Sequence, residues 1–264
     1  MHFDVNGTST FASTGGRPHE PGKPYVIFLH GSGQNRLTWT QQSRKFAYRG
    51  YNVLALDFPG HGKSAGSSPQ TIEASADWVV AAMDALGIAS AHIVAHSQGV
   101  LTALELGSRY PDRCDKIALV AGALAIPVND ALVSWADTKR PRAHSAMTGW
   151  GLGEVGHFHS NTVPGASHIG GGQRLMDMND APSLHTDLNA CNAYTNGPAA
   201  AQAISGQVLV VLADQDKMTP IKQGRKLAAA LPNATAVEFK DTGHMVPPER
   251  PYELNATLFE FLEN

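Results

Sequence analysis

The chain has 264 residues, of which 42% are hydrophobic and 16% charged, and its formal net charge is −3. This length allows a substantial core, and the composition is typical of a soluble globular protein. The weak negative charge gives no reason to expect nucleic acid or an anionic membrane as a partner. The first 23 residues are polar, and no apolar run approaches the about 18 residues needed to span a bilayer, so we expect a cytoplasmic protein without a leader or anchor.

Short apolar runs alternate along the chain with longer stretches of helix-compatible residues. Most of the apolar runs are nearly continuous in Val, Ile and Leu, which is typical of strands buried on both faces. The sequence predicts strands at 25–30, 51–57, 92–96, 116–121, 208–213 and 236–239. It predicts helices at 37–49, 71–86, 100–110, 221–231 and 251–262. This alternation predicts a mainly parallel twisted sheet flanked by helices.

Two segments depart from this alternation. Turn signals at Asn6-Gly7 and Gly15-Gly16 predict an antiparallel hairpin at the sheet edge within the first 20 residues. Residues 125–202 contain no strand-like apolar run and are too long for an ordinary loop. We therefore expect them to form a largely helical cap (lid) inserted into a core made of residues 1–124 and 203–264.

A serine stands at the junction of a predicted strand and a predicted helix. Residues 91–101 read AHIVAHSQGVL, with Ser97 directly after the strand and Gly99 two places further on. A serine on so tight a turn projects its hydroxyl from the sheet above a helix N-terminus. Ala95 stands where the commonest form of this turn has glycine, so the five-residue match alone is only moderately specific.

Other reactive residues follow other predicted strands. His30-Gly31-Ser32-Gly33 follows the strand at 25–30, Asp214 and Asp216 follow the strand at 208–213, and His244 follows the strand at 236–239. Parallel strands end at one edge of a sheet, where open α/β sheets bind their ligands. The sequence therefore brings a nucleophile, a Gly-rich turn, an acid and a histidine to one edge, in the chain order Ser, Asp, His.

In these features the chain resembles the α/β-hydrolase superfamily over nearly its whole length outside the cap. The His-Gly turn is present as His30-Gly31 and the D-x-x-G-x-G-x-S segment as residues 57–64. The acid segment D-x-x-x-P is residues 216–220, and the Gly-His turn is Gly243-His244. Five motifs in the expected order are far more specific than any one of them.

The resemblance assigns roles to these residues. Ser97 is the expected nucleophile, His244 its general base and Asp216 the acid that orients His244. We prefer Asp216 to Asp214 because Asp216 begins the D-x-x-x-P match, whereas Asp214 is expected to bond backbone N–H groups. The backbone N–H groups of Ser32 and Gln98 are the expected oxyanion hole.

Simpler roles are expected for several neighbours. Ser97 alone could be a helix N-cap. We expect His96 to be a packed residue, and His30 and His61 to bond backbone near the site. We expect Cys114 and Cys191 to be free thiols without a catalytic role. His157 and His159 suggest a metal site, but no carboxylate or cysteine pairing supports it, and no metal or cofactor is expected.

Substrate-binding residues are harder to predict. Gly31 and Gly33 of the Gly-rich turn, and Met245 and Val246 beside His244, are expected to contact the substrate. In the cap, Trp150, Met147, Met176 and Met178 could line an apolar pocket for the acyl or alcohol group, although core packing is an equal alternative.

The resulting functional hypothesis is a carboxylesterase-like serine hydrolase that cleaves carboxylic esters of small to medium size through an acyl-enzyme. A serine nucleophile argues against relatives that form an ester on an aspartate. The runner-up is a hydrolase that cleaves C–C bonds in ring-fission products, although Gln34-Asn35 replaces the Pro-Gly of that group. Thioesterase, lactonase and perhydrolase activities, and a ligand-sensing receptor, stay open. The expected partner is a small-molecule ester, and monomer and homodimer are both compatible with the sequence.

Overall fold

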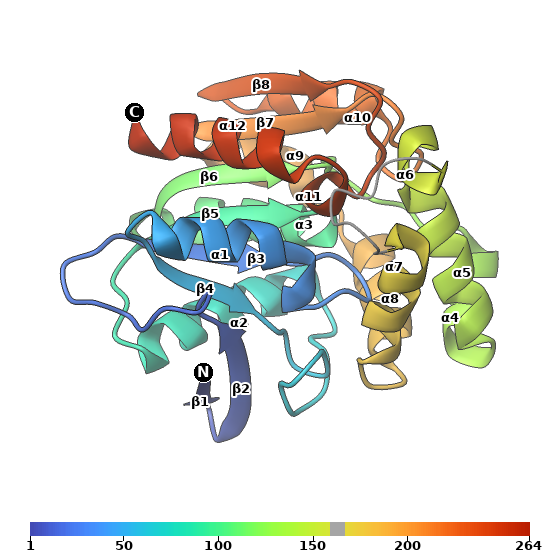
Figure 1. The fold of residues 1–264 in the computed structure, drawn as a ribbon, viewed down its shortest axis with the longest axis horizontal. Coiled ribbons are helices and arrows are strands. Elements are labelled where there is room, and N and C mark those ends of the chain that lie inside the picture. The colour runs from blue at the N-terminus through green and yellow to red at the C-terminus, as the bar shows by residue number, and fades with distance from the viewer. Residues whose placement is uncertain (159–166) are drawn as a thin grey trace.

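The computed structural model describes residues 1–158 and 167–264 (Figure 1). Its centre is a sheet in the order β1-β2-β4-β3-β5-β6-β7-β8. The strands are β1 (His2–Val5), β2 (Thr8–Ser13), β3 (Tyr25–Leu29), β4 (Asn52–Leu56), β5 (Ala91–His96), β6 (Cys114–Val120), β7 (Val208–Ala213) and β8 (Ala234–Phe239). Strands β3 to β8 run parallel, while β1 and β2 form an antiparallel hairpin that pairs with β4. The mainly parallel sheet predicted from the sequence is confirmed, and the hairpin lies at its edge.

Helices cover both faces of the sheet. Figure 1 shows α1 (Thr40–Tyr48) and α12 (Pro251–Glu263) on one face. The other face carries α2 (Ile72–Ala85), α3 (Gln98–Arg109), α9 (Gly197–Ala203) and α10 (Ile221–Ala230). Short helical turns lie at η1 (Arg36–Trp39), η2 (Pro111–Arg113) and α11 (Val246–Glu249). The predicted helix 37–49 is thus divided into η1 and α1, and the Asn35 side chain caps η1 by accepting the Leu37 N–H.

The strands are apolar at successive positions because both faces are buried. Side chains of a strand alternate between the two faces. Ile27 and Leu29 of β3 join the core cluster that contains α3 residues such as Leu104, whereas Val26 and Phe28 join the cluster that contains α1 and α12. A strand between two helical layers therefore has no polar face, which explains the continuous apolar runs.

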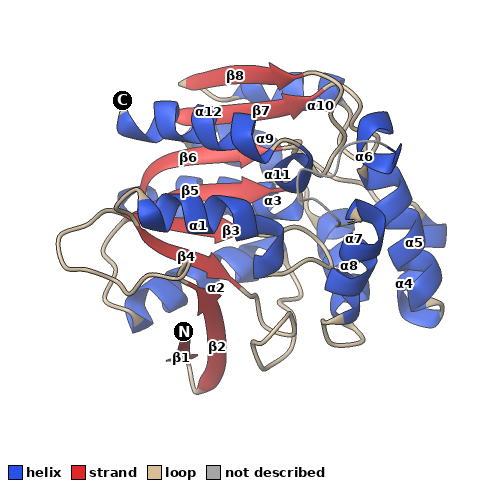
Figure 2. Ribbon diagram, in the orientation of Figure 1, coloured by secondary structure: helices blue, strands red, loops and turns tan. Residues whose placement is uncertain are grey.

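A helical segment, defined here as residues 130–193, joins β6 to the last part of the core. It comprises α4 (Asp130–Thr138), α5 (Arg140–Gly151), α6 (Glu154–Phe158), α7 (His168–Asp177) and α8 (Ser183–Ala193). Figure 2 shows these helices beyond the ends that the strand arrowheads mark. They have an apolar cluster of their own, which includes Leu132, Met176 and Leu184. In contrast α9 packs on α3 and α10, with Ala200 and Ala201 inside the main core.

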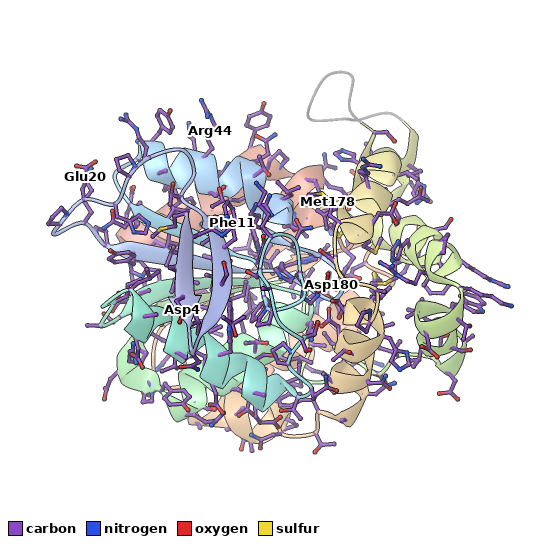
Figure 3. All side chains as sticks on the ribbon, turned by 90° about the horizontal axis from the view of Figure 1, so that it is seen from below. Asp4, Phe11, Glu20, Arg44, Met178 and Asp180 are labelled. Carbon is purple, nitrogen blue, oxygen red and sulfur yellow. The ribbon has the colours of Figure 1, made fainter. Side chains whose placement is uncertain are left out.

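The view in Figure 3 places Met178 and Asp180 on the side of the helical segment next to the core, while Phe11 lies in the hairpin strand β2.

Within the described residues, no helix combines the length and the hydropathy that crossing a bilayer requires.

Candidate active site

Ser97 occupies a sharp turn between β5 and α3. Its backbone has φ +56° and ψ −122°, a conformation that costs a residue with a side chain free energy and that recurs at functional sites. The Ser97 side chain makes no capping hydrogen bond to α3, although the residue stands at the N-cap position. The simple N-cap role therefore does not account for the serine.

Two glycines make room for this turn. A Cβ on Gly99 would lie 2.8 Å from the carbonyl oxygens of Leu29 and His30, and one on Gly31 would lie 2.7 Å from the Ser97 Cβ. Neither approach is open to a larger residue. Ala95 is fully buried in the core between Leu29 and Leu119 of the adjacent strands, so the turn accommodates its methyl group.

Asp216 and His244 meet beyond the ends of β7 and β8. His244 Nδ1 lies 2.8 Å from Asp216 Oδ2, and both side chains are almost completely buried. Thr219 donates its hydroxyl to the same oxygen at 2.8 Å, and the N–H groups of Met218 and Thr219 donate to Asp216 Oδ1 at 2.8 Å. Burial acts to raise the pKa of Asp216, but His244 and the Thr219 donors outweigh it and hold the pKa below its ordinary value. Asp216 is therefore a stable carboxylate that fixes the orientation of His244.

Asp214 has a different environment. Its Oδ1 accepts the Thr242 N–H at 3.2 Å, across the turn that precedes His244. Asp214 thus supports the backbone of the histidine turn, whereas Asp216 contacts the ring.

Ser97 and His244 line the same cavity, which has a volume of about 340 Å³. His244 Nε2, the ring atom opposite Asp216, is buried and has no hydrogen-bond partner among the described residues. Five of the seven methionines of the chain line the cavity: Met147, Met176, Met178, Met218 and Met245. Methionine side chains are apolar and adaptable, so this cavity suits an apolar group next to the serine hydroxyl.

The turn after β3 forms another part of the cavity wall. Ser32 and Gln34 line the cavity, and the Ser32 N–H has no hydrogen-bond partner among the described residues. Gln98 is the first residue of α3, where a backbone N–H has no partner in its own helix. Both N–H groups belong to residues that adjoin the serine turn.

The expected substrate-binding residues fall into two groups. Met245 lines the cavity, as do Met147, Met176 and Met178. Gly31 and Gly33 shape the turn, but they are not among the described residues that line the cavity.

Val246 and Trp150 do not lie where the sequence predicts them. Val246 is fully buried in the cluster with Leu254 and Phe259, because α11 begins there and turns its side chain into the core. Trp150 is 39% exposed in the last turn of α5 and is not among the described residues that line the cavity.

The neighbouring histidines are held by other groups. His96 Nε2 lies 2.8 Å from the backbone carbonyl of His244, and burial, with a contribution from His244, lowers the pKa of His96 to about 3. His30 bonds backbone through both ring nitrogens, at Gly31 O and Phe58 N. His61 contacts Pro59 O, as predicted, but it also lies 2.9 Å from the carboxylate oxygen Oδ2 of Asp187, a residue distant in sequence.

Histidines of the helical segment also have structural contacts. His144 lies 2.9 Å from Asp177 Oδ1, His185 contacts Val133 O, and His157 contacts Gly149 O. His159 lies outside the described residues. Within residues 1–158 and 167–264, no three His, Cys, Asp or Glu side chains are grouped to hold a metal ion.

Both cysteines are free. Burial raises the pKa of each thiol to about 12, so neither forms a thiolate near neutral pH.

Several polar residues around the site were not found from the sequence. Asp187 and Asn179 of the helical segment bond the turn at Gly33, and Glu249 accepts the Gly243 N–H beside His244. Asp187 and Asn179 lie about 150 residues from the turn in sequence, so no local motif could have revealed these contacts.

Comparison with known proteins identifies the family of the chain. The family model described as alpha/beta hydrolase family matches residues 26–257. A dihydrolipoyllysine-residue acetyltransferase component of an acetoin cleaving system from Cupriavidus necator is 30% identical, over 98% of this chain and 68% of that protein. A 2-hydroxy-6-oxononadienedioate/2-hydroxy-6-oxononatrienedioate hydrolase from Paraburkholderia phymatum is 26% identical, over 91% of this chain and 88% of that protein. The crystal structure of the enol-lactonase from Burkholderia xenovorans matches with a TM-score of 0.89 at 25% identity, over 100% of both chains. The chain belongs to the alpha/beta hydrolase family.

Proposed function

We propose that the protein hydrolyses carboxylic esters, including cyclic esters, through an acyl-enzyme on Ser97. The observation that carries this proposal is the His244–Asp216 pair, with a 2.8 Å contact at Nδ1 and an Nε2 that no described residue bonds, beside the cavity that Ser97 lines. A buried carboxylate at Nδ1 favours the tautomer whose Nε2 can accept a proton. The strained turn at Ser97 is a cost that a catalytic role would justify.

In the proposed mechanism the Ser97 hydroxyl attacks the ester carbonyl carbon while His244 Nε2 takes its proton. The carbonyl oxygen becomes an oxyanion, and the Ser32 and Gln98 N–H groups are its proposed donors. When the tetrahedral intermediate collapses, the C–O bond breaks and His244 gives its proton to the departing alcohol. A water molecule, deprotonated by His244, then attacks the acyl-enzyme and releases the acid and Ser97.

The cavity supports a substrate with an apolar acyl or alcohol group of small to medium size. Its volume is about 340 Å³, near the lower end of ordinary ligand pockets. The segment 125–202, proposed as a cap, supplies much of the apolar lining through residues such as Met147 and Met176. The likeness to an enol-lactonase agrees with this proposal, because an enol lactone is itself a carboxylic ester.

The test of this function is Ser97→Ala. We expect the wild-type protein to hydrolyse p-nitrophenyl acetate and butyrate, and the variant to lose this activity while it keeps its circular dichroism spectrum and melting temperature. Full activity in the Ser97→Ala variant would refute the proposed mechanism. Stoichiometric binding without turnover by the wild-type protein would instead indicate a ligand-sensing receptor.

C–C bond hydrolysis is a second candidate, because a ring-fission-type hydrolase is 26% identical over 91% of this chain. A vinylogous diketone assayed beside p-nitrophenyl esters and a thioester separates the candidates. A kcat/KM higher for the diketone than for every ester would replace ester hydrolysis by C–C cleavage as the main activity.

A further inference from the structure

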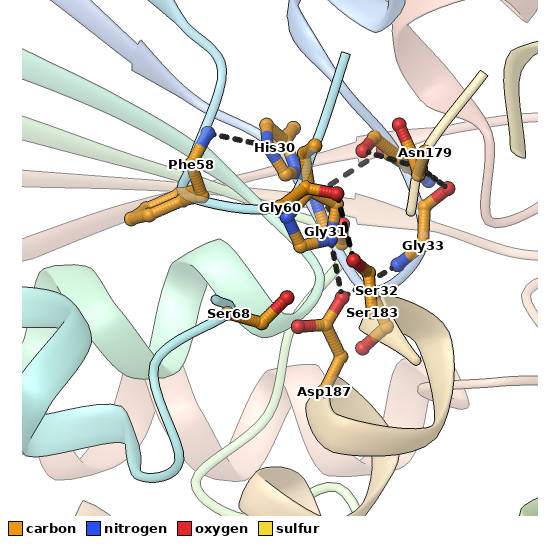
Figure 4. Close-up of polar contacts among 12 residues, drawn as sticks. His30, Gly31, Ser32, Gly33, Phe58, Gly60, Ser68, Asn179, Ser183 and Asp187 are labelled. Atoms are coloured by element: carbon orange, nitrogen blue, oxygen red, sulfur yellow. Dashed lines mark hydrogen bonds and ion pairs between the residues drawn. The ribbon is translucent and has the colours of Figure 1, made fainter. Parts of the chain in front are cut away.

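The turn that follows β3 is held from outside by two side chains of the helical segment (Figure 4). The Gly33 N–H donates to Asp187 Oδ2 at 2.8 Å, and Asn179 Nδ2 donates to the Gly33 carbonyl at 2.7 Å and to the Gln34 carbonyl at 3.1 Å. Asp187 and Asn179 are buried, with 3% and 8% of their surfaces exposed. Both backbone groups of Gly33 are therefore fixed by residues from another part of the chain.

The same two side chains also bond the neighbouring turn of residues 57–64. Asp187 Oδ2 lies 2.9 Å from His61 Nε2, and Asn179 Oδ1 accepts the Gly62 N–H at 2.9 Å. Burial acts to lower the pKa of His61, but Asp187 outweighs it and raises that pKa above its ordinary value. Each side chain thus connects two core turns through the helical segment.

Hydrogen bonds within and around the turn leave one N–H unused. The Gly31 N–H donates to Gln34 Oε1, the Gly33 N–H to Asp187, and the Gln34 N–H to the Gly31 carbonyl. Among residues 31–34, only the Ser32 N–H has no partner within the described part of the chain. Gly33 also has φ +64°, and its Cα carries no side chain that could resist a change in conformation. The Ser32 N–H belongs to the peptide that carries the Gly31 carbonyl, and this carbonyl accepts the Gln34 N–H and contacts His30 Nδ1. The Gln34 N–H in turn belongs to the peptide whose Gly33 carbonyl is held by Asn179, while Asp187 holds the Gly33 N–H. The external contacts therefore act on the Ser32 N–H through the backbone of Gly33 and Gln34.

We propose that Asp187 and Asn179 are positioning residues that keep the Ser32 N–H aimed at the oxyanion. This inference rests on the proposed function, because it needs Ser97 to form a tetrahedral oxyanion. If it holds, stabilisation of the oxyanion depends on how the helical segment packs against the core, and not only on residues of the core. A donor that is fixed in advance costs no reorganisation when charge develops, which is why its position matters.

The proposal is tested with two disrupting variants. Asp187→Ala removes the acceptor of the Gly33 N–H. Asn179→Asp keeps the shape and the acceptor for the Gly62 N–H but removes the donors to the Gly33 and Gln34 carbonyls. If Asp187→Ala does not fold, Asn179→Asp decides the question alone.

Ser183→Ala is the matched control. The Ser183 hydroxyl also comes from α8, is also buried, and donates to the Gly60 carbonyl at 2.7 Å. Within the described part of the chain it makes no hydrogen bond to residues 31–34. Asp187→Asn serves as the rescue, because its amide oxygen can still accept the Gly33 N–H.

The readouts are kcat and KM on p-nitrophenyl butyrate, and the affinities for a trifluoromethyl ketone and its methyl ketone analogue. The fluorinated ketone forms an oxyanion adduct with the serine, whereas the methyl ketone reports binding in the cavity. We expect the disrupting variants to lower kcat by about tenfold to a hundredfold, less than loss of a whole donor, with little change in KM. The trifluoromethyl ketone should lose affinity by a similar factor, and the methyl ketone should not. Asp187→Asn should recover part of the loss, and Ser183→Ala should change the melting temperature but not the ratio of the two affinities.

The inference is overturned if the disrupting variants melt earlier but keep the wild-type kcat and affinity ratio. It is also overturned if Ser183→Ala lowers kcat as much as they do. A wild-type protein that neither turns over esters nor binds the trifluoromethyl ketone would instead refute the proposed function, and this inference with it.

Discussion

A side-chain carbon on Gly31 would lie 2.7 Å from Cβ of Ser97, closer than two such carbons can approach. The same carbon would lie 3.3 Å from the backbone carbonyl of His96. Gly31 is not in the left-handed region, so its backbone conformation does not require glycine. Glycine is required at position 31 only by the lack of space, because the turns at Gly31 and Ser97 pack directly against each other.

Gly31→Ala should therefore impair catalysis by moving one turn away from the other. Overpacking of this kind costs about 1–3 kcal/mol, which corresponds to about tenfold to a hundredfold in kcat/KM if it falls on the transition state. Steady-state hydrolysis of p-nitrophenyl butyrate measures the effect.

Gly206→Ala is the control for this variant, because no atom of the described residues lies within 4 Å of the added carbon. It should keep wild-type activity. Equal activity in Gly31→Ala and Gly206→Ala would show that the two turns can separate without loss.

The two aspartates after β7 should respond differently to amide substitution. Asp216→Asn removes the charge that orients His244 and stabilises its imidazolium, and a loss of about 10³–10⁴ in kcat is expected. Asp214→Asn keeps an oxygen that can accept the Thr242 N–H, so it should change kcat by less than about threefold. A larger loss in Asp214→Asn than in Asp216→Asn, measured on the same ester, would exchange the two assignments.

Two buried histidines should make the free energy of unfolding depend on pH in opposite directions. The pKa of His96 is about 3 in the folded protein, because burial and the nearby His244 lower it. In the unfolded chain His96 has the ordinary histidine pKa of about 6.5, so below that pH the unfolded state binds more protons than the folded state. The free energy of unfolding therefore falls as the pH falls from about 6.5 toward 3. The pKa of His61 is raised beside Asp187, so its contribution is fully present below about 6.5 and is lost as pH rises through the folded value.

Urea unfolding of the wild-type protein and of His96→Asn checks this prediction. Between about pH 6.5 and 4.5 the variant should show a shallower dependence of the unfolding free energy on pH, by up to about 1.4 kcal/mol per pH unit for one proton. Parallel curves for the two proteins would mean that His96 takes up its proton without unfolding.

The strands and the residues at their ends could be predicted because they are local signals. A continuous apolar run marks a strand buried on both faces, and Ser97 and Asp216 each come soon after such a run, whereas His244 follows the partly exposed edge strand β8. Once the strands are parallel, their ends share one edge, so the pairing of Asp216 with His244 follows from topology.

Contacts between the helical segment and the core could not be predicted in this way. Asp187 contacts His61 and Gly33 because α8 packs against the core, and the hydrophobic periodicity of the sequence does not predict such packing. The position of Val246 next to His244 in sequence predicts a substrate contact, but the start of α11 turns its side chain into the core instead. Trp150 illustrates the same limit, because an aromatic residue in a glycine-rich helix does not reveal which face is covered.

Helix α7 contains a glycine that neither packing nor backbone conformation explains. Gly171 lines the cavity, and no atom of the described residues lies within 4 Å of a Cβ added there. Its φ is not positive, and glycine destabilises a helix interior by about 1 kcal/mol relative to alanine. Gly171 is itself exposed where it adjoins the cavity, so we expect a larger side chain there to reduce the room for a long acyl chain.

Substitutions at Gly171 should separate stability from substrate size. Gly171→Ala should raise the melting temperature, since alanine favours the helix and its methyl group would meet no atom of residues 1–158 or 167–264. Gly171→Leu should fill part of the cavity, so that kcat/KM on p-nitrophenyl octanoate falls by about tenfold or more relative to the acetate, on the scale of about 1–3 kcal/mol for an overfilled pocket.

Gly149 provides the matched control for this experiment. It lies inside α5, also has open space around an added Cβ, and is not among the described residues that line the cavity. Gly149→Leu should therefore keep the wild-type ratio of octanoate to acetate turnover. If Gly171→Leu keeps that ratio as well, the acyl chain lies elsewhere in the cavity, and the methionines on the other walls become the residues to vary next. If both variants change the ratio equally, the effect comes from the stability of the helical segment and not from the space at Gly171.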